Sequence, residues 1–302
     1  MSLQNINNPF KSLKFRYLVL RFLVLSVIIG FLLNFLQSSS GLKLNPQDSL
    51  ITIYITQFVL ICLWLVKDFR RLKAKLKYVV GDFPKNYNWL WLAGLVPLAI
   101  VFSIGAFLIL FYLLSLAAPS FVEQLLRNIA NTPSVESSNS FASNLLVSLA
   151  VCIVAPITEE FIFRGVILQR WATKWGISAG LLSSSLLFGF LHPQNPIGVS
   201  LLGIILGLLY IKTRSLIVPI AFHALNNILA VSSQFIPRDS STSTPGLTME
   251  SLQSSWWVGL LFMTISLPFL LRFIKKNWPR ENTIIPYLNN ANKHEKLVER
   301  VF

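Results

Sequence analysis

The chain of 302 residues is too apolar for a soluble domain of this length, because 54% of its residues are hydrophobic, 13% are charged and its mean hydropathy is +0.62. This composition excludes a soluble globular protein and predicts a protein that crosses a membrane several times. The net charge of +14 is compatible with nucleic-acid binding, but Lys and Arg cluster in short segments beside apolar runs. Such residues set membrane topology and meet anionic lipid, so we expect a lipid bilayer and no nucleic acid as their partner.

The apolar runs predict an all-α fold, a polytopic membrane bundle of about eight transmembrane helices. The first run follows Lys11, Lys14 and Arg16 but is long and lacks a small-x-small cleavage site, so we expect a retained helix and not a signal peptide. The expected spans are residues 17–36, 50–66, 89–117, 144–171, 179–191, 197–211, 216–233 and 255–273.

The distribution of Lys and Arg predicts the orientation of these spans. The segment 67–85 holds seven basic residues against Asp68 and Asp82, which indicates the cytoplasmic side. Alternating the spans from there places every dense basic segment on the same side. We therefore expect a multi-pass protein of the cell (inner) membrane with both termini in the cytoplasm.

Three regions follow from the spans and their connections. Residues 1–143 form an N-terminal membrane region of about three spans, which includes the basic loop 67–85 and ends in a polar outer connection, 118–143. Residues 144–233 form the core with most of the intramembrane polar residues. Residues 234–302 supply an outer loop, the last span and a basic cytoplasmic tail, which we expect to be solvated or to lie on the surface.

Two adjacent carboxylates, Glu159 and Glu160, lie with Arg164 inside the apolar run 145–168. A charge at such a depth costs at least ~2.5–3.5 kcal/mol on insertion scales, so it indicates function and a partner. On a helix Glu160 and Arg164 share a face at i,i+4 and can form an ion pair, whereas Glu159 points about 100° away. Glu159 is therefore the carboxylate left free for chemistry. Pro156 precedes it and is expected to bend the helix.

Two histidines, His192 and His223, also lie in or at the end of apolar runs. Phe188 and His192 share a helix face at i,i+4, as do His223 and Asn227. Counted from Arg170 and Arg214 at the inner surface, the helical rise places Glu159 and His223 at similar depths, ~16 Å and ~14 Å. Carboxylates and imidazoles on three helices at similar depth are hard to explain by packing alone.

These residues form three ordered motifs, Glu-Glu-x-x-x-Arg at 159–164, Phe-x-x-x-His at 188–192 and His-x-x-x-Asn at 223–227. The ordered set resembles the CPBP (CAAX protease and bacteriocin-processing, Abi) family of intramembrane glutamic endopeptidases. The resemblance covers about residues 145–229. It implies an intramembrane catalytic cavity and an endopeptidase that hydrolyses a peptide bond near the membrane, in CAAX-type prenyl-protein processing or in related peptide or bacteriocin maturation.

The resemblance also implies a role for each motif residue. Glu159, oriented by His192, would activate a water, while His223 and Asn227 would hold the oxyanion of the tetrahedral intermediate. The supporting positions are Glu160, Arg164 and Phe188. Glu160 and Arg164 would hold the helix geometry, although Glu160 could share the role of base. The implied partner is a peptide or lipidated-protein substrate, and no residue indicates whether that substrate is prenylated.

Three alternatives remain at this point. Two His and two Glu could form a His₂Glu zinc site, but Asn227 is a poor zinc ligand and the chain has no His-Glu-x-x-His segment, so we expect no metal or other cofactor. A non-enzymatic immunity or scaffold protein would not need all the polar positions. A proton-coupled transporter would usually show a repeated half, and no repeat is visible.

Overall fold

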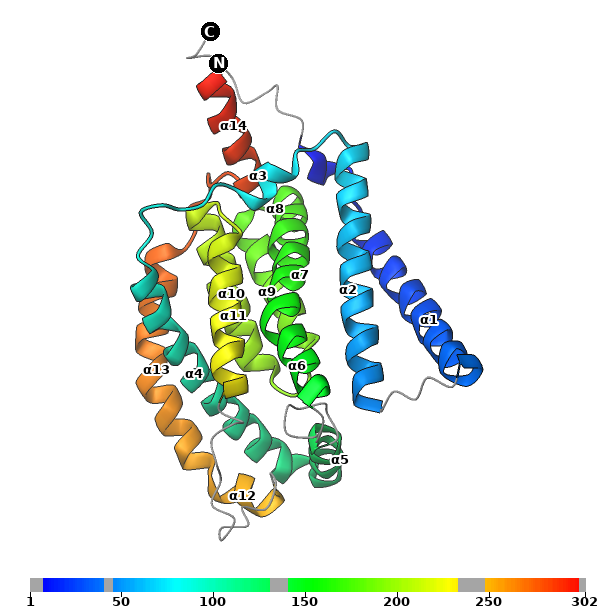
Figure 1. Ribbon diagram of the computed structural model, residues 1–302. Helices are drawn as coiled ribbons and strands as arrows, with labels where there is room; N and C mark the ends of the chain where they lie inside the picture. The colour runs from blue at the N-terminus through cyan, green and yellow to red at the C-terminus, as the bar shows by residue number, and fades with distance from the viewer. Residues whose placement is uncertain (1–7, 41–45, 131–140, 233–247, 299–302) are drawn as a thin grey trace.

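The computed structural model describes residues 8–40, 46–130, 141–232 and 248–298, and within these ranges every regular element is a helix (Figure 1). The predicted all-α membrane bundle is thus confirmed. Among the described residues, six helices are long and apolar enough to cross a membrane, and two further apolar helices, Ile177–Phe190 and Ile217–Ser232, are shorter. Each expected span corresponds to one of these eight helices, but the count of eight crossings is not confirmed by length and composition.

The helices are named in chain order. After the 3₁₀ turn η2 (Pro9–Lys11), the first half of the chain forms α1 (Phe15–Ser40), α2 (Pro46–Arg71), α3 (Leu76–Val80), α4 (Trp89–Ala117) and α5 (Pro119–Ala130). The second half forms α6 (Phe141–Leu149), η4 (Ala150–Val154), α7 (Ala155–Glu160), η5 (Phe161–Leu168), α8 (Gln169–Trp175), α9 (Ile177–Phe190), α10 (Pro196–Thr213), α11 (Ile217–Ser232), α12 (Met249–Ser254), α13 (Trp256–Asn277) and α14 (Pro286–Val298).

One continuous helical run from α6 to α8 carries the two adjacent glutamates. Within it η4 and η5 are π-helical, and they flank the short α-helical segment α7, which begins at Ala155 and holds Pro156. Proline cannot donate a backbone hydrogen bond, and π-helical turns inside α-helices are often found at functional sites. The helical run thus departs from regular α-helix on both sides of the segment that holds Pro156, Glu159 and Glu160.

Tight helix pairs form the centre of the bundle. Helix α13 packs along α4, and α10 packs along α9. Glycine permits the first contact, because a Cβ on Gly105 of α4 would lie 2.8 Å from the carbonyl oxygen of Gly259 on α13. By contrast, α1 packs mainly on α2 at one side of the bundle (Figure 1). It exposes a long row of large apolar side chains. Such a row is expected of a lipid-facing helix.

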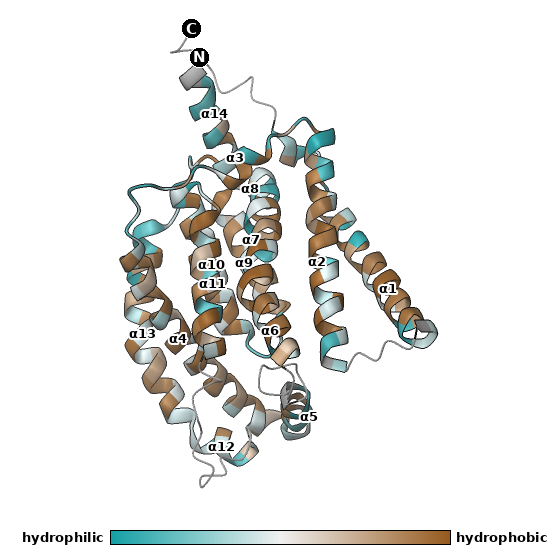
Figure 2. Cartoon of the chain, in the orientation of Figure 1, coloured by the Kyte–Doolittle hydropathy of each residue, from teal (hydrophilic) through white to brown (hydrophobic). Residues whose placement is uncertain are grey.

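The basic segments gather at one end of the bundle, which we call the basic end. It comprises the end of α2 with the following segment 72–85, Lys212 and Arg214 at the end of α10, and residues 272–280 at the end of α13. Figure 2 shows hydrophilic residues at this end and brown, hydrophobic residues along the spans. The described parts of both terminal segments also lie there (Figure 1).

Three connections expected to be loops or tails contain helices. Helix α5 occupies part of the segment 118–143, and α12 lies within 234–254, while residues 131–140 and 233–247 lie outside the described ranges. Of the two states expected for the C-terminal tail, its described part lies on the surface, because α14 packs against α3. The side chain of Asn290 donates hydrogen bonds to the carbonyls of Tyr78 (3.0 Å) and Arg214 (2.9 Å), so these buried contacts fix the tail to the surface.

Candidate active site

A buried ion pair joins Glu160 and Arg164, as their spacing predicts. The Arg164 Nη1 donates to Glu160 Oε1 at 2.7 Å, and the two residues are 1% and 0% exposed, respectively. Arg164 Nη2 also donates to the carbonyl of Gly203 on α10 at 3.2 Å. Its guanidinium carbon lies 4.5 Å from the ring centroid of Phe188 on α9. The pair therefore ties η5 to both α9 and α10.

His223 on α11 lies between the two glutamates. Its Nδ1 is 2.9 Å from Glu160 Oε1, and its Nε2 is 3.9 Å from Glu159 Oε2. A carboxylate can only accept, so an ionised Glu160 requires the imidazole to donate from Nδ1. That bond fixes the ring with Nε2 directed towards Glu159. Glu160 thus positions a histidine in addition to pairing with Arg164.

Glu159 is held by a residue that the sequence did not single out. Tyr54 on α2 donates its hydroxyl to Glu159 Oε1 at 2.7 Å, and the glutamate is only 7% exposed. A tyrosine in an apolar span is ordinary in a membrane protein, so the sequence carried no signal of this contact. The contact leaves Glu159 Oε2, on the His223 side, as the oxygen without a hydrogen bond in the described part of the chain.

His192 and Asn227 lie near the glutamate without a hydrogen bond to it. The Nδ1 of His192 is 2.7 Å from the carbonyl of Phe188, one helical turn earlier, and therefore donates to it. The expectation that His192 orients Glu159 thus finds no direct hydrogen bond in the described residues, where Tyr54 makes that contact instead. Asn227 Nδ2 donates to the carbonyl of Val151 in η4 at 2.8 Å. An amide has two N–H groups, so one remains available.

A cavity of about 820 Å³ brings the four predicted catalytic residues together. Its walls come from several helices, and Tyr54 and Phe188 line it as well. The four residues are Glu159, His192, His223 and Asn227. Glu160 and Arg164 are not among the lining residues. The cavity extends away from the basic end, to Asn195 in the turn before α10.

A second, mainly apolar cavity of about 560 Å³ lies between α1, α2, η5 and α9. It shares Tyr54, Glu159 and His192 with the first cavity. The two cavities therefore meet at the hydrogen-bonded pair of Tyr54 and Glu159. The second cavity extends towards the basic end, since Phe15 and Ile167 line it there.

The donor set does not fit the zinc alternative. Among the residues with described positions, no group of three or more His, Cys, Asp or Glu side chains is arranged to hold a metal ion. His223 directs Nδ1 to Glu160 and Nε2 to Glu159, and Nδ1 of His192 is committed to a backbone carbonyl. A His₂Glu site would need both imidazoles to face one point beside a carboxylate. The described residues place no such group together, although the hydrogen bonds of the two histidines engage Nδ1 and not Nε2.

Comparisons with known proteins converge on one family. Residues 141–229 match a family model described as type II CAAX prenyl endopeptidase Rce1-like. The chain is 32% identical over 171 residues to an Escherichia coli protein named "Uncharacterized 24.3 kDa protein", an alignment that covers 54% of this chain and 70% of that protein. It is 30% identical over 120 residues to the Bacillus subtilis "Putative membrane peptidase YdiL", and this alignment covers 39% of this chain and 47% of that protein. No solved structure matches the chain.

Proposed function

This integral membrane protein belongs to the Rce1-like family of type II CAAX prenyl endopeptidases, and from that premise we propose that Glu159 activates a water for hydrolysis of a peptide bond within the membrane. The observation that carries the proposal is the cavity in which Glu159, His192, His223 and Asn227 meet. Three polar side chains, from the turn after α9 and from α11, around one nearly buried carboxylate on α7 suit hydrolysis better than packing. The basic end would face the cytoplasm, following the distribution of Lys and Arg.

The hydrogen bonds suggest which residue accepts the proton of the water and which residues stabilise the oxyanion. With Oε1 occupied by the Tyr54 hydroxyl, Oε2 of Glu159 can accept a proton from a water in the cavity as that water attacks a carbonyl carbon. The oxyanion that forms needs donors. The second N–H of Asn227 can supply one, and Nε2 of His223 can supply another when it is protonated. Glu159 then returns the proton to the leaving amine.

The activity can be tested with purified protein in lipid vesicles. Three fluorogenic peptides with the same sequence would be compared: one farnesylated at a CAAX cysteine, one unmodified, and one joined to an apolar transmembrane segment. We expect cleavage of at least one membrane-bound peptide, with vesicles that lack the protein as control. The preferred peptide identifies the substrate class. No cleavage of any of the three would contradict an endopeptidase of CAAX type.

We expect Tyr54→Phe to lower kcat by about 10-fold or more with little change in KM. The reason is that a hydrogen bond to a charged group contributes about 1.5–3 kcal/mol, and this one positions the carboxylate that acts in the transition state. Peptide cleavage rates measured over a range of substrate concentrations separate the two constants. Tyr112→Phe on α4 is the matched control, because Tyr112 stacks on Trp256 away from the cavity. Equal rates for the two variants would contradict a positioning role for Tyr54.

We expect the protease to be independent of metal. Treatment with a chelator should leave the cleavage rate unchanged, since the proposed base is a carboxylate and the donor set does not fit zinc. Metal content measured on the purified protein should be well below one equivalent. Loss of activity in chelator together with recovery on addition of zinc would favour His and Glu ligation instead.

A further inference from the structure

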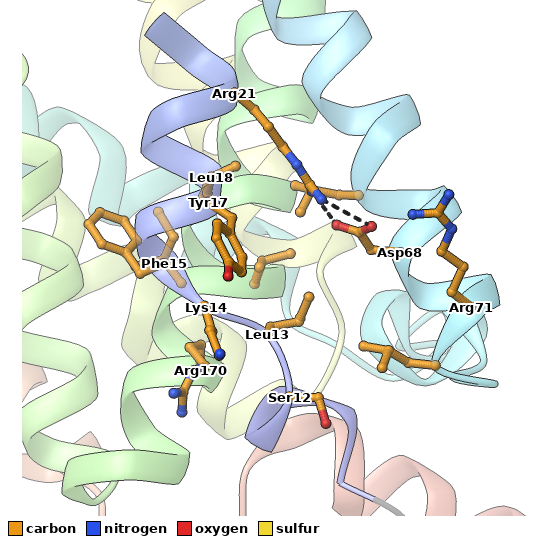
Figure 3. Close-up of a pocket in the computed structure, with 14 residues that line it drawn as sticks. Ser12, Leu13, Lys14, Phe15, Tyr17, Leu18, Arg21, Asp68, Arg71 and Arg170 are labelled. Atoms are coloured by element: carbon orange, nitrogen blue, oxygen red, sulfur yellow. Dashed lines mark hydrogen bonds and ion pairs between the residues drawn. The ribbon is translucent and has the colours of Figure 1, made fainter. Parts of the chain in front are cut away.

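A third cavity lies at the basic end, outside the proposed active site. Its volume is about 190 Å³. Figure 3 shows the residues around it, which come from the segment that leads into α1, from the end of α2, and from η5 and α8. Because α1 begins at Phe15, directly after Lys14, the cavity lies where polar sequence gives way to an apolar span. In a membrane this boundary is the level of the lipid headgroups.

The charges that line this cavity are unbalanced. Asp68 is its one acidic lining residue, and Arg21 pairs with it through both guanidinium nitrogens (Figure 3). Lys14, Arg71 and Arg170 also line the cavity. None of these three forms an ion pair with a carboxylate in the described part of the chain. Three positive charges thus line a space whose one carboxylate, Asp68, is already paired with Arg21.

The wall formed by the N-terminal segment is held in place. Phe10 is fully buried, with its ring in edge contact with the rings of Phe69 (5.8 Å) and Tyr287 (5.5 Å). At the start of α1, the ring of Phe15 lies 4.9 Å from that of Trp171 on α8. These contacts join the segment to α2, α8 and α14. The cavity is therefore preformed, and a ligand need not order its walls on binding.

The cavity continues into the apolar cavity described above. Phe15, Leu18 and Ile167 line both of them. Beyond these residues the apolar cavity is bounded by side chains such as Phe22 and Phe58, and it reaches Glu159. A cationic mouth at the headgroup level thus leads into an apolar channel within the membrane. The pair of cavities matches an amphiphile with an anionic head and a hydrocarbon chain.

We propose that this pair of cavities binds an anionic phospholipid, with the headgroup phosphate among Lys14, Arg71 and Arg170 and one acyl chain in the apolar cavity. Phosphate is the shared chemistry of a lipid headgroup and a soluble phosphate ester, but only a lipid accounts for the apolar continuation. Arg is suited to phosphate because its planar guanidinium donates two parallel hydrogen bonds. The site does not depend on proteolysis, so its test is a measurement of binding.

Binding would be measured on the full chain in detergent by native mass spectrometry with dioleoyl phosphatidylglycerol. The test variant is Lys14→Gln/Arg71→Gln/Arg170→Gln. The matched control is Arg272→Gln/Lys275→Gln/Lys276→Gln, which removes the same charge from exposed positions of α13 at the same end and touches neither cavity. We expect the first variant to bind the lipid at least about tenfold more weakly and the control to bind it nearly as the unmodified protein does. Equal melting temperatures would show that both variants are folded.

Two further ligands distinguish a lipid from a soluble phosphate ester, and an anionic headgroup from a zwitterionic one. Glycerol 3-phosphate, which has the head without the chains, should bind far more weakly than the lipid, and dioleoyl phosphatidylcholine should not replace phosphatidylglycerol. Leu18→Trp replaces an aliphatic side chain by a larger indole ring where the two cavities join. It should weaken lipid binding without a change in net charge. The proposal is overturned if the two triple variants bind the lipid equally. It is also overturned if glycerol 3-phosphate binds as tightly as the lipid.

Discussion

Glu159→Gln should abolish peptide-bond cleavage and leave the protein folded. A positioned general base contributes ~10²–10⁴-fold to the rate, and glutamine cannot accept the proton of the attacking water. The substitution keeps the shape of the side chain, and the amide oxygen can still accept the hydrogen bond from Tyr54. The loss should therefore be in kcat, measured with a membrane-bound fluorogenic peptide in vesicles, while the melting temperature stays close to that of the unmodified protein.

The chain offers a matched control for this prediction. Glu123→Gln makes the same chemical change at an exposed carboxylate of α5, which is outside both cavities at the site. It should cleave the peptide at the unmodified rate. If Glu159→Gln kept more than about one tenth of the activity, Glu159 would not be the base, since a missing base should cost at least ~10²-fold.

Arg164→Met should strongly destabilise the protein. The substitution leaves Glu160 fully buried without its cation, and breaking a buried ion pair from one side costs about 3–5 kcal/mol. Glu160 Oε2 already has no hydrogen-bond partner in the described residues, so His223 at Oε1 would be the one remaining contact of this carboxylate there. The free energy of unfolding in mixed micelles measures the effect. A large fall in cleavage should accompany it, because Glu160 positions His223.

Two further variants separate the buried charge from simple loss of a side chain. Arg164→Met/Glu160→Gln removes both charges and should recover part of the lost stability, because no unpaired charge is left in the interior. Arg127→Met breaks the exposed i,i+4 contact with Glu123, in which the nitrogen and oxygen are 3.9 Å apart, and should cost about 0–1 kcal/mol. A loss for Arg164→Met as small as that for Arg127→Met would contradict the structural role of the buried pair.

The sequence by itself determined the features that depend on residues near one another in the chain. Runs of apolar residues predicted every long helix, because a segment in lipid must satisfy its own backbone hydrogen bonds and does so as a helix. The ion pair of Glu160 and Arg164 followed from their spacing alone, since residues at i and i+4 share a helix face. Three local motifs were likewise enough to indicate the family.

The tertiary structure decided which of these residues touch one another. Tyr54 and Glu159 are 105 positions apart, and their hydrogen bond depends on how α2 packs against α7. His223 was expected to share a cavity with Glu159, but its approach to Glu160 through Nδ1 depends on the rotation of α11. Helical periodicity fixes directions within one helix but not the rotation and height of one helix against another. Those are set by side-chain packing over the whole interface, which no short pattern encodes.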